Sequence, residues 1–239
     1  MATSTKSTND APPDGGTILV WDLPLRLAHW ALALCVAGSW ATHYAGAEWS
    51  AWHARCGYAV LVLVVFRIVW GFVGTRHARF AVFLRGPRRV VDYLRGRSSA
   101  PVAGHNPLGA LSVVAMLALL LAQAVTGLFA NDEIAFTGPF YGWVSQATSG
   151  RLTSLHHANA DWLLALLVLH LAAVAWYGLV RRQPLVKAML SGRRAANEVP
   201  PGEGIAGSRV VLAGVIVLLL AGLLALAIRA APEAVLSYY

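Results

Sequence analysis

The sequence predicts an all-α integral membrane protein, with a four-helix transmembrane bundle followed by a fifth transmembrane helix. Of its 239 residues, 57% are hydrophobic and only 13% are charged, whereas a soluble domain carries about twice this share of charge. Five segments are long and apolar enough to cross a hydrocarbon layer about 30 Å thick. Inside lipid each must be helical, because unpaired backbone groups find no water there. The expected helices cover residues 24–46, 53–74, 107–130, 157–180 and 210–230.

The polar start of the chain is expected to lie outside the membrane. Residues 1–20 are rich in Ser, Thr, Pro and Gly, and they lack the basic and then apolar pattern of a signal peptide. We expect them to form a disordered tail. In "WDLP", Asp22 is placed to cap the first helix and Pro24 fits its first turn. The expected divisions after the tail are a membrane domain at 21–194, a linker at 195–207, and the fifth helix with a short tail at 208–239.

The net charge of +8 is unevenly distributed. Segment 76–97 holds seven arginines against one acid, and "RRQPLVKAMLSGRR", after the fourth helix, adds five basic residues. The other two connections hold three acidic residues against one arginine. Basic loops mark the cytoplasmic side of a membrane. The pattern predicts a cytoplasmic N-terminus, five crossings and a C-terminus outside, with the basic loop on anionic membrane lipids rather than on nucleic acid.

The fourth apolar segment, "SLHHANADWLLALLVLH", carries histidines at both ends. Ionisable residues inside a membrane are costly and by default mark a functional site. His156 and His170 are 14 residues apart, which places them within about 40° of one helix face and about 21 Å apart along the axis. His157 points about 140° away from His170, so we expect it to face the interface or a neighbouring helix.

Two imidazoles at opposite ends of one buried face are typical ligands for two stacked haems, and iron with two histidine ligands suits electron transfer. Zinc ligands would instead gather around one point. Each haem needs a second histidine. His29, at the cytoplasmic start of the first helix, is the expected partner of His170. For His156 the spacing leaves two candidates, His53 at the start of the second helix and His43, 14 residues after His29.

Several stretches together resemble the bacterial cytochrome b561 family, which includes the b-type cytochrome subunit of membrane-bound nickel–iron hydrogenases. They are "WDLPLRLAHW", "WHARCGYAVLVLVVFRIVWGFVG", "RFAVFLRGPRRVVDYLRG", "GHNPLGALSVVAMLALLLAQAVTGLFANDE" and "LTSLHHANADWLLALLVLHLAAV". They cover about residues 21 to 194 in the order typical of the family. The resemblance implies a four-helix haem-binding bundle with two b haems. The ligand positions carried over from the family are His29, His53, His156 and His170.

The resemblance therefore favours His53 over His43 as the partner of His156 in the outer pair, with His29 and His170 as the inner pair. It implies a di-haem b cytochrome of the bacterial inner (plasma) membrane, carrying electrons between the quinone pool and a periplasmic redox partner. That partner is expected to be a c-type cytochrome or a hydrogenase. The chain is then either the cytochrome b subunit of an oxidoreductase or a quinone reductase by itself.

Other polar residues are expected near the haems, and each has two possible roles. Arg67 lies 14 residues after His53 and so shares its helix face at the inner level; it either pairs with a propionate of the inner haem or reaches the inner surface. His105, in "GHNP", either binds a propionate or a quinone or caps the loop. Gln123 and Thr126 on the third helix either contact cofactor or quinone or bond between helices.

Three residues are expected to be structural. His77, in "TRHARF", is expected at the interface, in contact with water and headgroups. Cys35 and Cys56 belong to no C-x-x-C-H or C-x-x-C motif, so covalent haem attachment and iron–sulfur ligation are not expected. We expect both cysteines to be small buried residues.

The alternative function is a haem-free membrane transporter or metal-binding subunit that uses the same histidines. Proton relays within membranes usually include acidic residues in the spans. Only Asp161 lies near such a position, close to the outer end of the fourth segment. The scarcity of intramembrane carboxylates favours the cytochrome interpretation.

Overall fold

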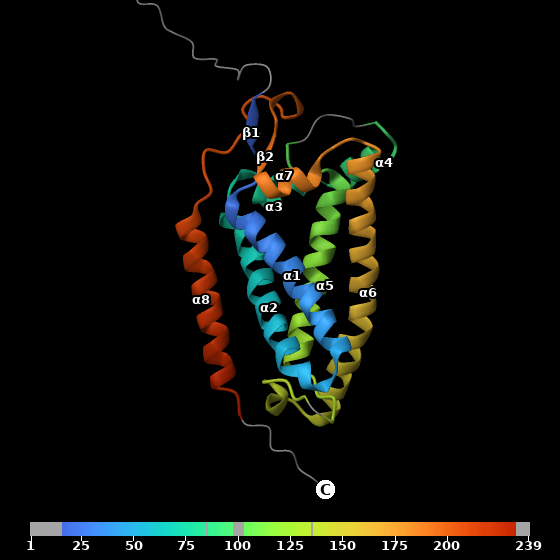
Figure 1. The fold of residues 1–239 in the computed structure, drawn as a ribbon, viewed down its shortest axis with the longest axis vertical. Coiled ribbons are helices and arrows are strands. Elements are labelled where there is room, and N and C mark those ends of the chain that lie inside the picture. The colour runs from blue at the N-terminus through green and yellow to red at the C-terminus, as the bar shows by residue number, and fades with distance from the viewer. Residues whose placement is uncertain (1–15, 85, 98–102, 135, 233–239) are drawn as a thin grey trace, which may run out of the picture.

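The structure is a computed structural model that describes residues 16–84, 86–97, 103–134 and 136–232. Four long helices form the bundle, and a fifth lies along its outside (Figure 1). The predicted all-α membrane fold is confirmed. The bundle helices are α1 (Leu23–Ala45), α2 (Ser50–Val73), α5 (Pro107–Leu128) and α6 (Gln146–Leu179), and the outer helix is α8 (Val210–Arg229).

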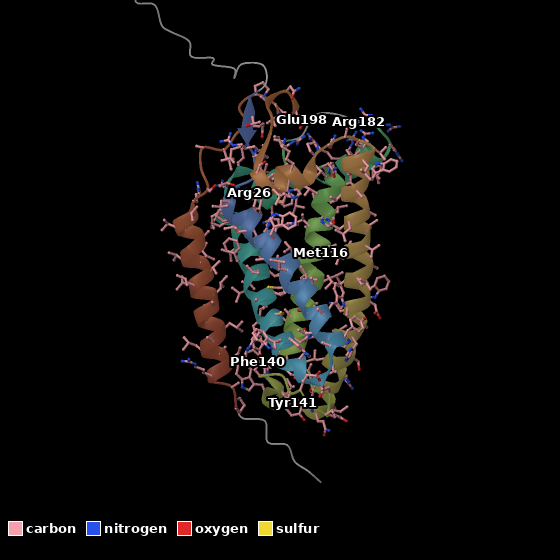
Figure 2. All side chains as sticks on the ribbon, in the orientation of Figure 1. Arg26, Met116, Phe140, Tyr141, Arg182 and Glu198 are labelled. Carbon is pink, nitrogen blue, oxygen red and sulfur yellow. The ribbon has the colours of Figure 1, made fainter. Side chains whose placement is uncertain are left out.

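The shorter elements lie at the two ends of the bundle (Figure 1). One end, called here the basic end, carries the arginine-rich segments, and the other, the loop end, carries the connection between α5 and α6. Figure 2 shows Arg182 and Glu198 at the basic end and Phe140 and Tyr141 at the loop end. At the basic end lie β1 (Thr17–Leu19), η2 (Arg76–Ala78), α3 (Phe80–Phe83), α4 (Pro87–Leu94), α7 (Leu185–Ser191), β2 (Arg193–Ala195) and η4 (Ala196–Glu198), and at the loop end η1 (Ala47–Trp49) and η3 (Tyr141–Trp143).

Four helical stretches in the described residues are long and apolar enough to cross a membrane. Helix α1 is not among them, although it has 23 residues. Its two histidines, with Ser39 and Thr42, lower its hydropathy. It nevertheless packs closely along α2, so part of its surface faces a protein neighbour rather than lipid. The four stretches are Ala47–Val73, Pro107–Leu128, Gln146–Leu179 and Val210–Arg229.

The start of α1 is fixed by Asp22, as its position in the sequence predicts. Its fully buried carboxylate accepts hydrogen bonds from the Leu25 backbone N–H at 2.8 Å, from Trp70 Nε1 at 3.1 Å and from the Thr75 hydroxyl. The first bond is a helix N-cap, and the other two join α1 to the end of α2. One side chain therefore both begins α1 and fixes its position in the bundle.

The basic end is more ordered than the sequence predicts. Residues 1–15 of the expected tail 1–20 lie outside the described part of the chain, but within that tail β1 pairs antiparallel with β2, with Ile18 opposite Arg194. Strand β2 reaches into the expected linker 195–207. The two strands have only three residues each and are far apart in sequence, so no local pattern signals their pairing.

The expectation for His77 is wrong, because its side chain is buried rather than exposed at the interface. Its Nε2 lies 2.6 Å from the backbone oxygen of Glu203. The Glu203 carboxylate also pairs with Arg76, with 2.6 Å between Nη2 and Oε1. The expected linker thus folds back over the end of α2 and covers the imidazole.

Helix α6 begins earlier than its apolar segment, at Gln146 rather than near residue 157. The Ser145 side chain caps it by accepting from the Thr148 N–H at 3.2 Å. At 1.5 Å per residue the 34 residues span about 51 Å, which exceeds a hydrocarbon core of about 30 Å. Hydropathy identifies only the part of a helix that lipid surrounds, so the polar first turns are missed.

The bundle consists of two antiparallel helix pairs, α1 with α2 and α5 with α6, joined by packing of α2 on α5. Helices α1 and α2 approach closely at Gly38, where an added Cβ would lie 3.1 Å from Cys56 Sγ. Cys35 and Cys56 are both free and only partly buried. The central apolar contacts join Val60, Val64, Leu117, Leu120, Ala124 and Leu163.

Candidate functional site

At the basic end, one histidine from α1 faces one from α6. The ring centres of His29 and His170 are 6.4 Å apart, and both side chains are partly buried. Residues 141 positions apart in the sequence are thus brought together where α1 faces α6. This is the pair that the helix geometry predicts for the inner level.

At the loop end, four histidines form a closed ring. The ring centres of His53 and His156 are 6.3 Å apart, and those of His43 and His157 are 6.5 Å apart. The two remaining sides join His43 to His53 at 6.1 Å and His156 to His157 at 6.1 Å. Helix α6 supplies two members of this ring, and α1 and α2 supply one each.

These separations fit a haem iron held from both sides. An imidazole nitrogen binds a metal at about 2 Å and lies about 1 Å from its ring centre, so two rings on opposite sides of one iron stand roughly 6 Å apart. The His29–His170 pair and the His53–His156 pair both meet this condition. Among the described residues, no three His, Cys, Asp or Glu side chains are placed to hold one metal ion together.

Hydrogen bonds at the loop end distinguish the two candidate pairs. Nδ1 of His53 donates to the backbone oxygen of Ser39 at 2.8 Å, and Nδ1 of His156 donates to the backbone oxygen of Gln123 at 3.0 Å. A metal-binding histidine almost always donates its second N–H in this way, which fixes the ring and directs the other nitrogen to the metal. Nε2 of His156 lies 3.0 Å from Gln123 Nε2, so this amide has to turn aside when His156 binds iron. Neither carbonyl partner could be predicted from the sequence.

Glycines make room beside the same two rings. A Cβ added at Gly127 would lie 3.1 Å from Cε1 of His156, so the ring lies directly against the α5 backbone. Gly57 follows His53 by one helical turn, and a Cβ there would meet nothing within 4 Å. The structure therefore has open space at Gly57, one turn after His53, and packs His156 closely against α5.

His43 and His157 have a different environment. Both are exposed, whereas His53 and His156 are partly buried. Within the part of the chain that the structure describes, neither has a ring nitrogen bonded to a backbone carbonyl. Burial and hydrogen bonding therefore favour His53 and His156 as the outer pair, although the ring distances alone would allow either.

Arg67 and His105, at the basic end, have buried polar atoms without a hydrogen-bond partner among the described residues. Arg67 is buried, and among the described residues neither Nη1 nor Nη2 has a hydrogen-bond partner. Its guanidinium lies over the rings of Phe80 and Phe83, at 5.3 and 5.9 Å. An unpaired buried cation is costly, so this group requires an anion. A haem propionate would supply one, in addition to the nearby Asp22 carboxylate. This fits the first of the two alternatives for Arg67, and burial of the side chain argues against the second, in which it reaches the inner surface.

His105 lies in the same region. Its ring centre is 4.8 Å from those of both Trp21 and Phe83, and its Nδ1 is buried without a partner in the described residues. Burial, followed by the nearby charge of Arg67, lowers the pKa of His105 to about 3. The imidazole is therefore neutral, with one nitrogen to donate and one to accept. The loop cap is made instead by Asn106, which accepts from the Gly109 N–H at 2.7 Å.

Sequence reasoning missed Asn159, which is buried one turn after His156. Its Nδ2 donates to Gln123 Oε1 at 2.6 Å and to the backbone oxygen of Leu119 at 3.0 Å. Gln123 Nε2 in turn lies 3.0 Å from His156 Nε2, and the Thr126 hydroxyl lies 3.3 Å from His156 Nδ1. An amide inside an apolar run was the available signal. Gln123 and Thr126 thus contact both the neighbouring helix and the candidate ligand.

Comparison with known proteins agrees with this geometry. The family described as prokaryotic cytochrome b561 matches residues 20–192. The chain belongs to the prokaryotic cytochrome b561 family.

Several curated members of the cytochrome b561 family are similar over most of their length. A probable Ni/Fe-hydrogenase B-type cytochrome subunit of Azotobacter chroococcum is 26% identical over 218 residues, covering 77% of this chain and 91% of the relative. The corresponding subunit of Cupriavidus necator is 25% identical, covering 83% and 96%. A probable Ni/Fe-hydrogenase 1 B-type cytochrome subunit of Escherichia coli K12 is 22% identical, covering 74% and 90%.

Membership of the cytochrome b561 family establishes the general function. The protein is a multi-pass membrane b-type cytochrome that binds haem b and takes part in electron transport. The haem-free transporter interpretation is therefore not supported. The number of haems, the ligand pairs and the redox partners have to be inferred from the arrangement of the histidines and of the two ends of the bundle.

Proposed function

We propose that this cytochrome binds two haems and carries electrons across the bacterial inner membrane, between the quinone pool and a periplasmic redox partner. The observation that supports this most directly is the presence of two imidazole pairs, His29–His170 and His53–His156, at opposite ends of one bundle with ring separations of 6.4 and 6.3 Å. Bound haem b supplies one-electron oxidation and reduction. The protein provides the axial nitrogens, fixes the outer rings through Nδ1 and excludes water with its apolar helices.

The proposed orientation follows from charge. The arginine-rich segments and the described start of the chain lie at the basic end (Figure 1), and positively charged loops stay in the cytoplasm. This puts the His29–His170 pair near the cytoplasm and the four-histidine ring near the periplasm. All five long helices then cross the membrane, with α1 shielded from lipid on one side by α2.

The basic end also offers polar groups for a quinone. Asn106 Nδ2 donates to the Tyr177 hydroxyl at 2.9 Å, and the Tyr177 and Tyr93 hydroxyls are 2.8 Å apart. His105 lies beside Asn106 and has a buried nitrogen that needs a partner. A quinone carbonyl accepts hydrogen bonds from such donors. Quinone binding near the His29–His170 pair would place it next to the proposed inner haem.

The proposed periplasmic partner is a hydrogenase or a soluble c-type cytochrome. The names of the relatives support a hydrogenase, because several are described as hydrogenase cytochrome subunits. The loop end also projects from the membrane, because α6 is longer than a hydrocarbon core requires. This leaves protein surface at the loop end for docking.

The first test is a haem count on the purified protein by pyridine haemochrome, together with a reduced-minus-oxidised spectrum. Two b haems per chain, both low-spin, are expected. A count of one would show that one histidine pair has been misassigned. A folded preparation without haem would contradict the proposed function altogether.

The second test concerns the redox partners. Adding a quinol to the oxidised protein in vesicles should reduce both haems, because electrons entering at the basic end can cross to the loop end. In a His29→Ala variant this reduction should stop, while a soluble reductant applied at the loop end still reduces the remaining haem. Equal reduction by quinol in the variant would contradict the proposed position of the quinone site.

A further inference from the structure

The histidine ring at the loop end contains two members, His43 and His157, that the proposed ligand pairs do not use. Both are exposed, and their ring centres are 6.5 Å apart. They are neighbours of the outer ligands, at 6.1 Å from His53 and from His156 respectively. These ring-centre distances, together with that between His53 and His156, determine where His43 and His157 lie relative to the proposed outer haem.

The members of both pairs face each other across the space between α6 and the helix pair formed by α1 and α2. His53 and His156 face each other from α2 and α6, and His43 and His157 face each other from α1 and α6. A haem held between the first pair lies across the line that joins their rings, about midway between them. The ring centres of His53 and His156 are 6.3 Å apart and those of His43 and His157 are 6.5 Å apart, and 6.1 Å separates each member of one pair from its neighbour in the other. The plane of such a haem would therefore also pass between His43 and His157.

The second pair therefore stands on both sides of the haem edge rather than over its iron. The carboxylates on a haem extend beyond its edge, roughly 8 Å from the iron. An imidazole reaches a hydrogen-bond acceptor about 4 Å from its own ring centre, so rings offset sideways by 6.1 Å are within reach of them. Charged groups remain where water reaches them. His43 and His157 are the exposed members of the ring. A haem whose edge lies between these two side chains would therefore keep its carboxylates hydrated.

We propose that His43 and His157 bind the propionates of the outer haem, one from each side of its edge, as hydrogen-bond donors and not as iron ligands. This inference rests on the proposed function, because it requires a haem between His53 and His156. A neutral imidazole N–H donates to a carboxylate, and a hydrogen bond to a charged acceptor is about twice as strong as a neutral one. The role explains why two exposed histidines flank the ligand pair.

The experiment measures haem loss from the full-length protein to excess haem-free myoglobin. The test variants are His43→Leu, His157→Leu and their combination. Each single variant should keep two low-spin haems after purification but release the outer haem about tenfold faster, since one charge-assisted hydrogen bond is worth about a factor of ten or more. The outer haem is identified as the kinetic phase that is missing in His53→Ala.

Two controls separate a specific contact from general disturbance. Tyr44→Leu changes an exposed aromatic side chain next to His43, with 5.1 Å between their ring centres, and should leave both release rates unchanged. His43→Gln and His157→Gln keep a side-chain N–H donor, so release should return towards the wild-type rate. A purely structural role would not be restored by glutamine in this way.

The outcomes are distinguishable. Wild-type release rates in the double leucine variant, with two haems retained, would overturn the inference and leave the proposed function intact. Complete absence of the outer haem from that variant, with its retention in His53→Ala, would show that His43 and His157 are the iron ligands and overturn the inference. Fewer than two haems in the wild-type protein would contradict the proposed function itself.

Discussion

Each end of the bundle carries a pair of facing imidazoles, but the surroundings of the two pairs differ. At the basic end, the His29–His170 pair lies in a region with a buried arginine, Arg67, whose two terminal nitrogens have no partner among the described residues. At the loop end, His53 and His156 are held by backbone carbonyls and by the uncharged network of Gln123. One end therefore offers a buried cation to an anionic ligand, and the other offers neutral donors. If each end binds a haem as proposed, the difference predicts that the two haems are anchored by different forces.

The largest effects should come from removing the imidazoles themselves. His170→Ala and His156→Ala should each leave one haem per chain instead of two, because each removes one axial ligand from a different pair. The pyridine haemochrome count measures this directly. His157→Ala is the matched control for ligand loss: it changes the neighbour of His156 and should retain both haems at purification, although it should release the outer haem faster. If His170→Ala and His156→Ala both kept two haems, the division into two pairs would be wrong.

A second pair of variants sharpens the assignment at the loop end. His53→Ala should lose the outer haem, whereas His43→Ala should keep it at the time of purification. The reason is that only His53 has its Nδ1 fixed on a carbonyl, that of Ser39, and open space one turn later at Gly57. A reversal of the two results would favour the arrangement with both ligand pairs on α1 and α6.

The charge difference between the ends can be tested at Arg67. Arg67→Leu should speed release of the inner haem by about tenfold or more, because a propionate would lose a charge-assisted partner. It should also lower the midpoint potential of that haem, since a nearby cation favours the reduced iron. Potentiometric titration and haem transfer measure the two effects.

Arg67→Lys keeps the charge and should restore much of both properties. Arg55→Leu is the matched control, because it removes an exposed arginine from the same helix at the loop end and should leave the inner haem unchanged. An equal fall in potential for Arg55→Leu would mean that the overall charge of the protein, and not a local pair, sets the potential.

The smallest expected effect is steric and confined to the loop end. Gly127→Ala would place a Cβ 3.1 Å from His156 Cε1, so the ring must shift by a few tenths of an ångström. Release of the outer haem should become severalfold faster while the inner haem is unaffected. Gly150→Ala, where a Cβ meets nothing within 4 Å, gives the same gain in helix propensity without the contact. The prediction fails if the two variants behave alike.

Much of the architecture was readable from the sequence because lipid imposes strong local rules. An apolar run of about 20 residues has to be a helix in a membrane, and a separation of 14 residues has to put His156 and His170 on nearly one face. Asp22 before Pro24 likewise predicts the start of α1, which the structure confirms. Each of these inferences needs only the chain near the residue concerned.

What failed or stayed open depended on segments that meet only in the folded chain. The pairing of β1 with β2, and the burial of His77 beneath Glu203, join segments that are far apart in the sequence and carry no periodic signal. The early start of α6 was hidden because its first turns lie beyond the apolar run.

The sequence by itself determined the membrane fold, the two levels of histidines and, through family resemblance, the haem cofactor. Only the tertiary structure brought His53, His43, His156 and His157 into one ring and gave two of them carbonyl partners from other segments. Helical periodicity fixes the direction of a side chain on its own helix. It carries no information about the backbone oxygen or the glycine that a neighbouring helix presents to that side chain, and these are the features that distinguish a candidate ligand from its neighbour.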